Sequence, residues 1–263
     1  MHANETVGKD FKISIITVCY NSTSTIESTL KSVACQSYTN IEHVVIDGAS
    51  TDDTIELIKH YKTMLVSEPD KGIYDAMNKG IKLATGNIIG MLNADDFYID
   101  NNVLNEVAQV FADESIDACF ADLVYVDQFD TNRIVRYWKS RPYQEGLFKQ
   151  GWMPAHPTFF ARKSVYEKFG VFDLGYKIAA DFELLFRFIE QNKIKTYYLP
   201  KVLVKMRLGG TTNKNLKNIR TQNNEIIRIL RAHHHGFSAF QFWRHKIINR
   251  FVQFISRPKS ASR

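Results

Sequence analysis

The chain has 263 residues, of which 44% are hydrophobic and 24% are charged. This composition is typical of a folded globular protein and excludes a disordered one. The length fits one large α/β domain, alone or with an appendage. No run approaches the ~20 apolar residues of a membrane span, and the polar start, Met1 to Lys12, lacks the apolar core of a secretion signal. Cys19, Cys35 and Cys119 have no paired spacing, which favours a reducing cytoplasm.

The net charge of +6 is unevenly placed along the chain. From Lys214 onward there are eleven Lys or Arg residues against one acid, Glu225, so this tail holds +10 and the preceding residues hold −4. Such a contrast indicates two electrostatically distinct parts. We expect a main unit over residues 1–212 and a basic, amphipathic helical extension over residues 213–263.

In the first half of the chain, short β-branched apolar runs alternate with segments of helical spacing. The predicted strands are 12–20, 41–46, 64–66, 88–92 and 118–126, and the predicted helices are 22–37, 51–61, 73–84 and 103–111. This alternation predicts right-handed crossovers and a parallel, doubly wound α/β sheet covered on both faces. Further along, the pattern predicts strands at 134–139 and 158–161, helices at 163–169 and 181–191, and a strand pair, 194–199 with 202–207.

The carboxyl ends of the predicted strands carry polar groups, and ligands of doubly wound sheets bind at that edge. The segments that leave these strands are Tyr20-Asn21, Asp47-Gly48, Glu68-Pro69-Asp70 and Asn93-Ala94-Asp95-Asp96. Paired carboxylates at the end of a buried strand suit a Mg²⁺ or Mn²⁺ ion that holds a diphosphate. The alternative for Asp95 and Asp96 is a solvated turn before a helix.

The loop after the first strand, residues 19–25, contains no glycine, so it is not the Gly-x-Gly-x-x-Gly turn of a dinucleotide fold. The chain also has no Gly-Lys-Ser/Thr phosphate loop. Hydride transfer and P-loop chemistry are therefore disfavoured. A nucleotide would instead need a base and ribose pocket on the sheet edge, with a metal ion on its diphosphate.

Segments 13–21, 45–54, 70–78 and 92–96 resemble, in this order, motifs of the family-two inverting glycosyltransferases of GT-A fold. The resemblance covers roughly residues 12 to 210. It implies transfer of a sugar from a nucleotide-diphosphate donor to a saccharide or lipid-linked acceptor, with a divalent cation, Mg²⁺ or Mn²⁺. It also implies a part in bacterial surface polysaccharide assembly, such as O-antigen or capsule.

By this resemblance, Asp96 is the direct metal ligand and Asp95 binds the ribose or a metal-bound water. Asp47 matches an acid near the nucleoside base; since many members carry a second acid where this chain has Gly48, the hydrogen bond to the base comes from Asp47 or from backbone. Asn93 stands where some relatives have a further acid.

Tyr20 and Asn21 would line the base pocket by the same resemblance, and Lys71 or Asn78 would approach base or phosphate. For each of these residues the alternative is a strand-end or helix-capping role. His156, between two prolines, is a candidate contact to acceptor or phosphate, and its alternative is a structural hydrogen bond.

Asp181 resembles the family's catalytic base, at the start of a helix near the acceptor. Such a base takes the proton of the acceptor hydroxyl as its oxygen attacks the sugar. Ala180 replaces the usual preceding Glu, Glu183 is a competing candidate, and a helix cap is the alternative role. The loop 209–212 is either a lid over the donor or a simple turn.

The tail combines helical apolar spacing with cations, which suits either an anionic membrane surface or a helix pair packed on the main unit. We therefore expect a cytoplasmic protein that can lie peripherally on the inner face of the membrane. Two other functions are less well supported. A nucleotidyltransferase would need a Gly-rich loop that 19–25 lacks, and no recognised nucleic-acid module accompanies the basic tail.

Overall fold

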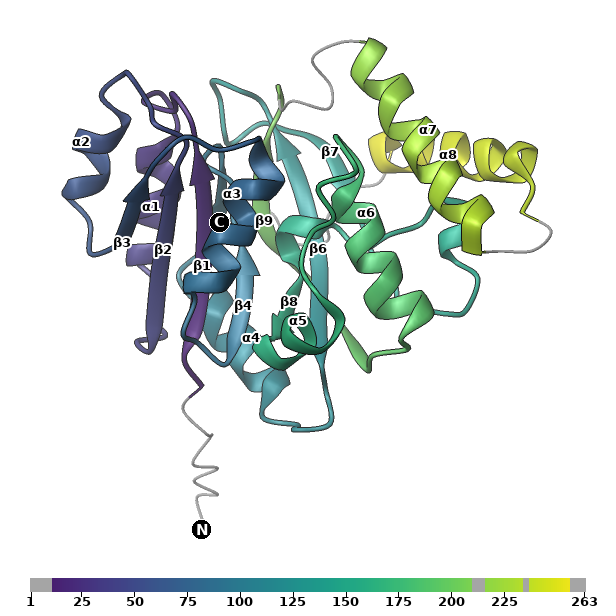
Figure 1. Cartoon of the computed structure of the whole chain (residues 1–263), viewed down its shortest axis with the longest axis horizontal. Coiled ribbons are helices and arrows are strands. Elements are labelled where there is room, and N and C mark those ends of the chain that lie inside the picture. Colours follow the sequence, from purple (N-terminus) through teal and green to yellow (C-terminus); the bar gives the residue numbers. More distant parts are fainter. Residues whose placement is uncertain (1–10, 210–215, 234–236, 256–263) are drawn as a thin grey trace.

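The computed structural model describes residues 11–209, 216–233 and 237–255. Within them a nine-stranded sheet has the order β3-β2-β1-β4-β8-β6-β9-β5, with β7 paired to β6 (Figure 1). The first four of these strands are mutually parallel, and β6 is parallel to β9. Strands β5, β7 and β8 run antiparallel to their neighbours. The predicted α/β class with a mainly parallel, doubly wound sheet is confirmed.

The strands are β1 (Ile13–Cys19), β2 (Ile41–Asp47), β3 (Met64–Ser67), β4 (Ile88–Met91), β5 (Asp96–Tyr98), β6 (Ala118–Val126), β7 (Ile134–Trp138), β8 (Phe160–Arg162) and β9 (Thr196–Arg207). The helices are α1 (Ile26–Ala34), α2 (Thr54–Lys59), α3 (Ile73–Leu83), α4 (Val103–Phe111), α5 (Lys163–Phe169), α6 (Ala180–Leu185), α7 (Leu216–His233) and α8 (Ala239–Ile255). Two 3₁₀ turns, η1 (Phe148–Gln150) and η2 (His156–Thr158), and a π-helical segment, η3 (Phe186–Gln191), complete the elements.

The central strand β1 is buried along its whole length because helices cover both faces of the sheet. Its side chains alternate between the faces. Ile13 and Ile15 join the core under α1 and α4, whereas Ile16 and Val18 join the core under α3. Figure 1 shows α3 in front of this part of the sheet. Gly80 permits the close approach of α3, since a Cβ there would lie 2.3 Å from Cγ2 of Ile16.

The strand register brings the carboxyl ends of the parallel strands to one edge of the sheet. Cys19 pairs with Asp47, and Asp47 pairs with Ser67. The segments that follow these strands therefore start side by side, as the sequence predicted. We call this edge the C-terminal rim; it comprises the loops after β1, β2, β3 and β4.

Four expectations about the elements need correction. The predicted strand pair, 194–199 with 202–207, is one strand, β9. Leu199 pairs with Ala121 and Val202 with Asp122, so the two residues between them bulge out of the ladder. One of these is a proline, which has no N–H to give to a ladder.

The sequence reasoning also missed β5, which is three residues long and contains Asp96. The helix expected over 22–37 begins only at Ile26, and the helix expected over 181–191 is α-helical to Leu185 and π-helical beyond it.

The C-terminal helices lie at one end of the molecule, on the side of α6 and away from α2 (Figure 1). Ile226, Ile229 and Leu230 of α7 and Phe242 of α8 are buried in the same core cluster as the apolar residues of α6. The proposed boundary between residues 212 and 213 lies outside the described residues. In the part of the chain that is described, no helix has the length and apolar character needed to cross a membrane.

Candidate active site

The turn from Asn93 to Asp96 connects β4 to β5 and places two carboxylates at the C-terminal rim. The N–H of Asp96 donates to the carbonyl of Asn93 at 3.0 Å. Thr29, a buried residue of α1, donates its hydroxyl to the carbonyl of Asp96 at 2.7 Å. The backbone of the turn is therefore held by a neighbouring helix.

Asp96 is completely buried, and neither of its carboxylate oxygens has a hydrogen-bond partner among the described residues. Burial raises the pKa of this carboxyl well above its usual value, and the negative charge of Asp95 raises it further. The guanidinium of Arg207, at the end of β9, lies nearby and donates to the carbonyl of Asp95 at 2.9 Å. The positive charge of Arg207 thus acts on both carboxylates, and that of Asp96 is buried without a hydrogen bond to any described residue.

This arrangement fits a divalent cation. Buried carboxylate oxygens are nearly always paired or bound to a metal, because an unpaired buried charge is costly. No group of three or more His, Cys, Asp or Glu side chains within the described ranges could enclose an ion. A cation held by Asp95 and Asp96 would therefore take its other ligands from phosphate oxygens and water, as Mg²⁺ commonly does.

Asp181 is the second residue of α6, and it is surrounded by polar groups from α6 itself and from two other elements. Its Oδ1 accepts the backbone N–H of Phe182 at 2.8 Å and lies 3.4 Å from the hydroxyl of Tyr74 on α3. Its Oδ2 lies 3.5 Å from Nδ1 of His156 in η2. The hydroxyl of Thr158 fixes η2 on β6 by donating to the carbonyl of Ala121 at 3.0 Å.

Asp95, His156 and Asp181 share one region of the molecule. Burial lowers the pKa of His156, and the negative charges of Asp181 and then Asp95 oppose that effect. The imidazole is therefore mainly neutral at pH 7. Two carboxylates from distant parts of the chain thus act electrostatically on the same histidine, so the candidate metal-binding turn lies in the neighbourhood of the candidate base.

Glu183, the competing candidate base, is held in an ion pair. Its two oxygens accept from Nε and Nη2 of Arg187 at 2.8 and 2.9 Å. Arg187 also donates to the carbonyls of Phe169 and Val171. Glu183 therefore secures the loop after α5, and Asp181 is the acid that faces His156.

Asp47 ends β2 as expected, but its carboxylate is fully buried and occupied. It accepts the N–H of Ser50 at 2.9 Å and the hydroxyl of Ser67 at 2.7 Å, and also the hydroxyl of Ser50. The side chain thus holds the loop that follows β2. The sequence reasoning considered Asp47 or backbone for a contact to the base, and this geometry leaves the Asp47 carboxylate no exposed surface for it.

Asp70 is an acid at the rim to which the sequence reasoning gave no role. A Cβ built on Gly48 would lie 2.6 Å from Oδ2 of Asp70 and 3.5 Å from Cδ2 of Tyr20. Asp70 therefore reaches over Gly48, beside the Tyr20 ring, which is 62% exposed. The signal in the sequence was the position of Asp70 just after the predicted strand 64–66, but nothing there links residue 70 to residue 48.

The other predicted donor contacts divide into two groups. Tyr20 and Lys71 are exposed at the rim. Asn21 instead accepts the N–H of Thr51 at 2.9 Å and so joins the first two loops. Asn78 exchanges two hydrogen bonds of 2.9 Å with the backbone of Phe172. Of the candidate lid 209–212, only Gly209 lies inside the described residues; its φ of 120° is one that favours glycine.

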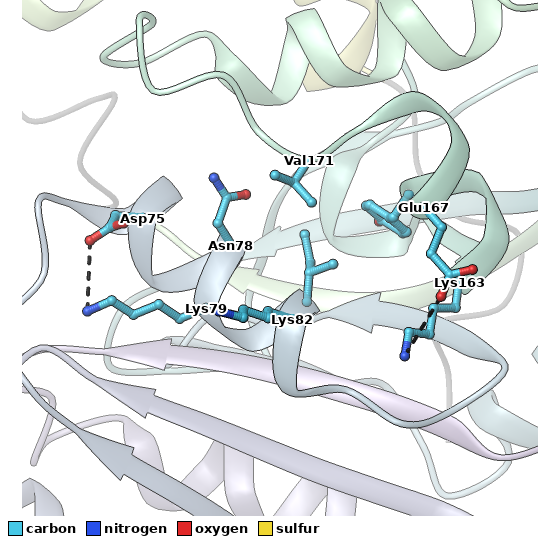
Figure 2. A pocket seen from close by; sticks show the side chains of 9 residues that line it. Asp75, Asn78, Lys79, Lys82, Lys163, Glu167 and Val171 are labelled. Carbon is cyan, nitrogen blue, oxygen red and sulfur yellow. Dashed lines mark ion pairs between the residues drawn. The ribbon is translucent and has the colours of Figure 1, made fainter.

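A separate pocket of about 610 Å³ lies between α3 and α5 and is shown in Figure 2. Of the predicted site residues only Asn78 lines it. Two of its lysines are paired with acids, Lys79 with Asp75 at 3.8 Å and Lys163 with Glu167 at 3.9 Å (Figure 2). This pocket is therefore not the place where the candidate metal-binding turn and the candidate base meet.

Known proteins share both the sequence and the fold. A PGL/p-HBAD biosynthesis glycosyltransferase of Mycobacterium bovis (strain BCG / Pasteur 1173P2) is 28% identical over 207 residues, which cover 76% of this chain and 78% of that protein. The UDP-Glc:alpha-D-GlcNAc-diphosphoundecaprenol beta-1,3-glucosyltransferase WfaP of Escherichia coli is 24% identical over 249 residues, which cover 88% of this chain and 92% of WfaP.

Two solved structures are similar in fold. TarS of S. aureus (residues 1–349, with UDP-GlcNAc) superposes with a TM-score of 0.64 at 19% identity, covering 90% of this chain and 73% of that one. The mannosyltransferase PcManGT of Pyrobaculum calidifontis, with GDP-Man and Mn²⁺, superposes with a TM-score of 0.64 at 18% identity, covering 91% and 70%. Residues 14–170 match the family described as Glycosyl transferase family 2. The chain is therefore a glycosyltransferase and belongs to glycosyl transferase family 2.

Proposed function

We propose that this glycosyltransferase moves a sugar from a nucleotide-diphosphate donor to a saccharide or lipid-linked acceptor, with inversion and with a divalent cation. The observation that supports this best is Asp96, a buried carboxylate beside Asp95 that has no hydrogen-bond partner on either oxygen within the described part of the chain. Asp95 is the less buried of the two, so it is the one that a cation arriving from solvent would reach first.

The donor would lie along the C-terminal rim. Its base would stack on the exposed ring of Tyr20, next to the carboxylate of Asp70 and the exposed Lys71. Its diphosphate would lie at Asp95 and Asp96, where a bound Mg²⁺ or Mn²⁺ neutralises the charge of the leaving group. PcManGT supports the cation, since its structure holds Mn²⁺ together with GDP-Man.

Asp181 would act as the general base. Its carboxylate accepts the proton of the acceptor hydroxyl while the hydroxyl oxygen forms a bond to the anomeric carbon. The bond from that carbon to the diphosphate breaks, and the nucleoside diphosphate leaves from the opposite face, which inverts the configuration. His156, 3.5 Å from Asp181, borders the space into which the acceptor would enter.

For the acceptor, we propose a lipid-linked saccharide used in bacterial surface polysaccharide assembly. The name of WfaP describes an acceptor of this kind, GlcNAc-diphosphoundecaprenol. In this chain α8 exposes Phe240 by 77%, Ile247 by 66% and Ile248 by 52%, next to the exposed cation Arg244. Exposed aromatic and aliphatic side chains among cations suit an anionic membrane surface.

We accordingly propose that residues 1–212 form the catalytic unit and that 213–263 form an extension that also contacts the membrane, so that the protein acts at the inner face of the membrane. Flotation with anionic and with zwitterionic vesicles tests the contact. We expect binding to the anionic vesicles alone, and weaker binding when Phe240 and Ile247 are changed to Ser. Equal binding to both vesicle types, or none, contradicts it.

The donor site is tested with UDP-, GDP- and dTDP-sugars, scored for thermal stabilisation in Mn²⁺ and in EDTA. We expect one nucleotide class to raise the melting temperature only when the cation is present. Asp95→Asn should abolish this shift. Asp181→Asn should keep the cation-dependent rise in melting temperature but lose the transfer of sugar to the acceptor. The matched control is Asp100→Asn, an exposed acid in the loop after β5, whose carbonyl accepts from the side chain of Gln36, two residues beyond the end of α1.

The two substitutions separate donor binding from catalysis. If no nucleotide sugar stabilises the wild type, the donor site is wrong. If Asp181→Asn transfers sugar at the wild-type rate, Asp181 is not the base, whatever the donor. If Asp100→Asn also abolishes the rise in melting temperature, the loss in Asp95→Asn comes from the change in surface charge and not from a donor site at the C-terminal rim.

A further inference from the structure

Glu225 is the one acid in the basic tail, and its carboxylate binds the backbone of another segment. It accepts backbone hydrogen bonds from three consecutive residues of another segment. Its Oε1 accepts the N–H of Lys177 at 3.0 Å, and its Oε2 accepts the N–H groups of Ile178 and Ala179, each at 3.0 Å. Consecutive N–H groups that converge on one anion form a strong and specific contact.

These three residues lead directly into α6 and Asp181. The carbonyl of Ile178 accepts the hydroxyl of Tyr74 at 2.7 Å, so the same peptide is held from α3 on one side and from α7 on the other. The preceding segment, residues 170–178, belongs to no helix or strand. The position of Asp181 therefore depends on these side-chain contacts as well as on α6 itself.

The helix that carries Glu225 is itself firmly seated. Ile226, Ile229 and Leu230 of α7 are at most 4% exposed. Arg228 lies over the ring of Tyr176, at 4.6 Å from its centroid, and so adds a contact next to the clasped peptide. A rigid support is needed because a base misplaced by about 1 Å can lose ~100-fold in rate.

We propose that Glu225 is a positioning residue for the catalytic base, and that α7 thereby forms part of the active site although it lies beyond the segment, 14–170, that matches the family. Glu225 reaches neither donor nor acceptor in this role; it fixes the peptide 177–179 from which Asp181 projects. The inference rests on the proposed role of Asp181. In the test below, hydrogen exchange reports on the contact made by Glu225, and it does so whether or not Asp181 is the base.

The experiment compares full-length wild type with Glu225→Gln and Glu225→Ala. Asn224→Ala is the matched control, because Asn224 is the preceding residue on α7 and is exposed. Glu225→Ala removes all three acceptor contacts. Glu225→Gln keeps one acceptor oxygen but turns an amide N–H₂ group toward the other donors. The increase in amide exchange at 177–179 and the loss of kcat should therefore be smallest in Asn224→Ala, intermediate in Glu225→Gln and largest in Glu225→Ala.

Three readouts are expected. Amide hydrogen exchange of residues 177–179 should speed up in Glu225→Ala, with little change in β1 and β2. Nucleotide-sugar binding in Mn²⁺ should keep its stoichiometry, and the KM for donor should stay within about threefold. The kcat for transfer should fall about 10- to 100-fold. A general loss of folding would instead reduce the binding stoichiometry together with kcat.

Several outcomes would overturn the proposal. Unchanged exchange at 177–179 shows that Glu225 does not hold the peptide. Faster exchange with kcat within twofold of wild type shows that the contact is structural only. If donor binding and kcat fall in parallel, the contact is likewise structural only. A wild type that binds no nucleotide sugar refutes the donor site, whereas the exchange readout still decides whether Glu225 holds the peptide.

Discussion

Asp96→Asn should make the cation-free protein more stable while it removes the function of the site. The wild-type carboxylate is completely buried, neither oxygen has a hydrogen-bond partner among the described residues, and Asp95 adds a second negative charge beside it. A buried polar group without a hydrogen bond costs about 1–3 kcal/mol, and the positive charge of Arg207 offsets part of the further cost of the buried negative charge. Asparagine has nearly the same shape without the charge. We expect the variant to gain about 1–2 kcal/mol in the free energy of unfolding in EDTA.

When cation and donor are present, the wild type should instead have the larger free energy of unfolding. A ligand that binds only the folded state stabilises it by about 2.7 kcal/mol at a concentration of 100 times its Kd. The wild type should gain this amount. Asp96→Asn should gain little, since it offers a neutral amide in place of a charged ligand. For a protein of this size, each 1 kcal/mol corresponds to about 2–4 °C in Tm.

Urea denaturation followed by tryptophan fluorescence measures both effects, since Trp152 is buried in the core. Each protein is unfolded in EDTA, in Mn²⁺ alone, and in Mn²⁺ with the nucleotide diphosphate that the donor panel identifies. Asp100→Asn controls for the loss of one acid. The reasoning is refuted if Asp96→Asn loses more than about 1 kcal/mol in EDTA, because Asp96 would then be a structural residue. An undiminished gain from cation and nucleotide in the variant would refute it equally.

Three further predictions concern the fold and the donor. Gly80→Ala should cost about 1–3 kcal/mol of stability, because the new Cβ would lie 2.3 Å from the side chain of Ile16; urea titration against the exposed control Lys82→Ala measures it. His43 has its pKa lowered to about 4 by burial. The unfolded chain therefore binds this proton first as the pH falls, and stability should drop by up to about 3 kcal/mol between about pH 6.5 and pH 4. His43→Gln should flatten that part of the pH profile, and an unchanged slope would contradict the assignment. Asp70→Ala should raise the KM for donor several-fold with kcat within about twofold, since Asp70 borders the proposed base pocket and is remote from the reacting carbon; a selective loss of kcat would contradict this placement.

Local patterns in the sequence were enough to predict most of the sheet and its helices. β1, β6 and α5 come from uninterrupted apolar runs or clear helical spacing, and their bounds agree with the expected segments to within a residue or two. The errors come from tertiary effects. β5 is too short to show a period and exists because β9 lies beside it. Likewise, β9 continues through a proline because a bulge removes two residues from its ladder with β6.

The candidate site could be predicted less completely, because polar residues at strand ends have two uses. Asp47 and Asn78 matched the pattern of donor contacts, yet their polar atoms are taken up by neighbouring backbone and hydroxyl groups. Asp70 is the first residue of the matching segment 70–78 and received no role of its own, yet it lies next to Tyr20. A sequence shows which residues can bind a ligand. Whether their oxygens are already occupied depends on contacts between loops that lie far apart in the chain.

Asp181 illustrates why the second half of the site was harder to derive than the first. The turn with Asp95 and Asp96 follows directly from a buried strand, so one short segment fixes both its chemistry and its place. Asp181 instead takes its position from contacts with Tyr74, His156 and, through the peptide before it, Glu225. These residues span about 150 positions, and none of them predicts the others. A substitution at any of the three should therefore change the rate of transfer more than the binding of donor, which is the pattern that distinguishes a placed base from an isolated acid on a helix.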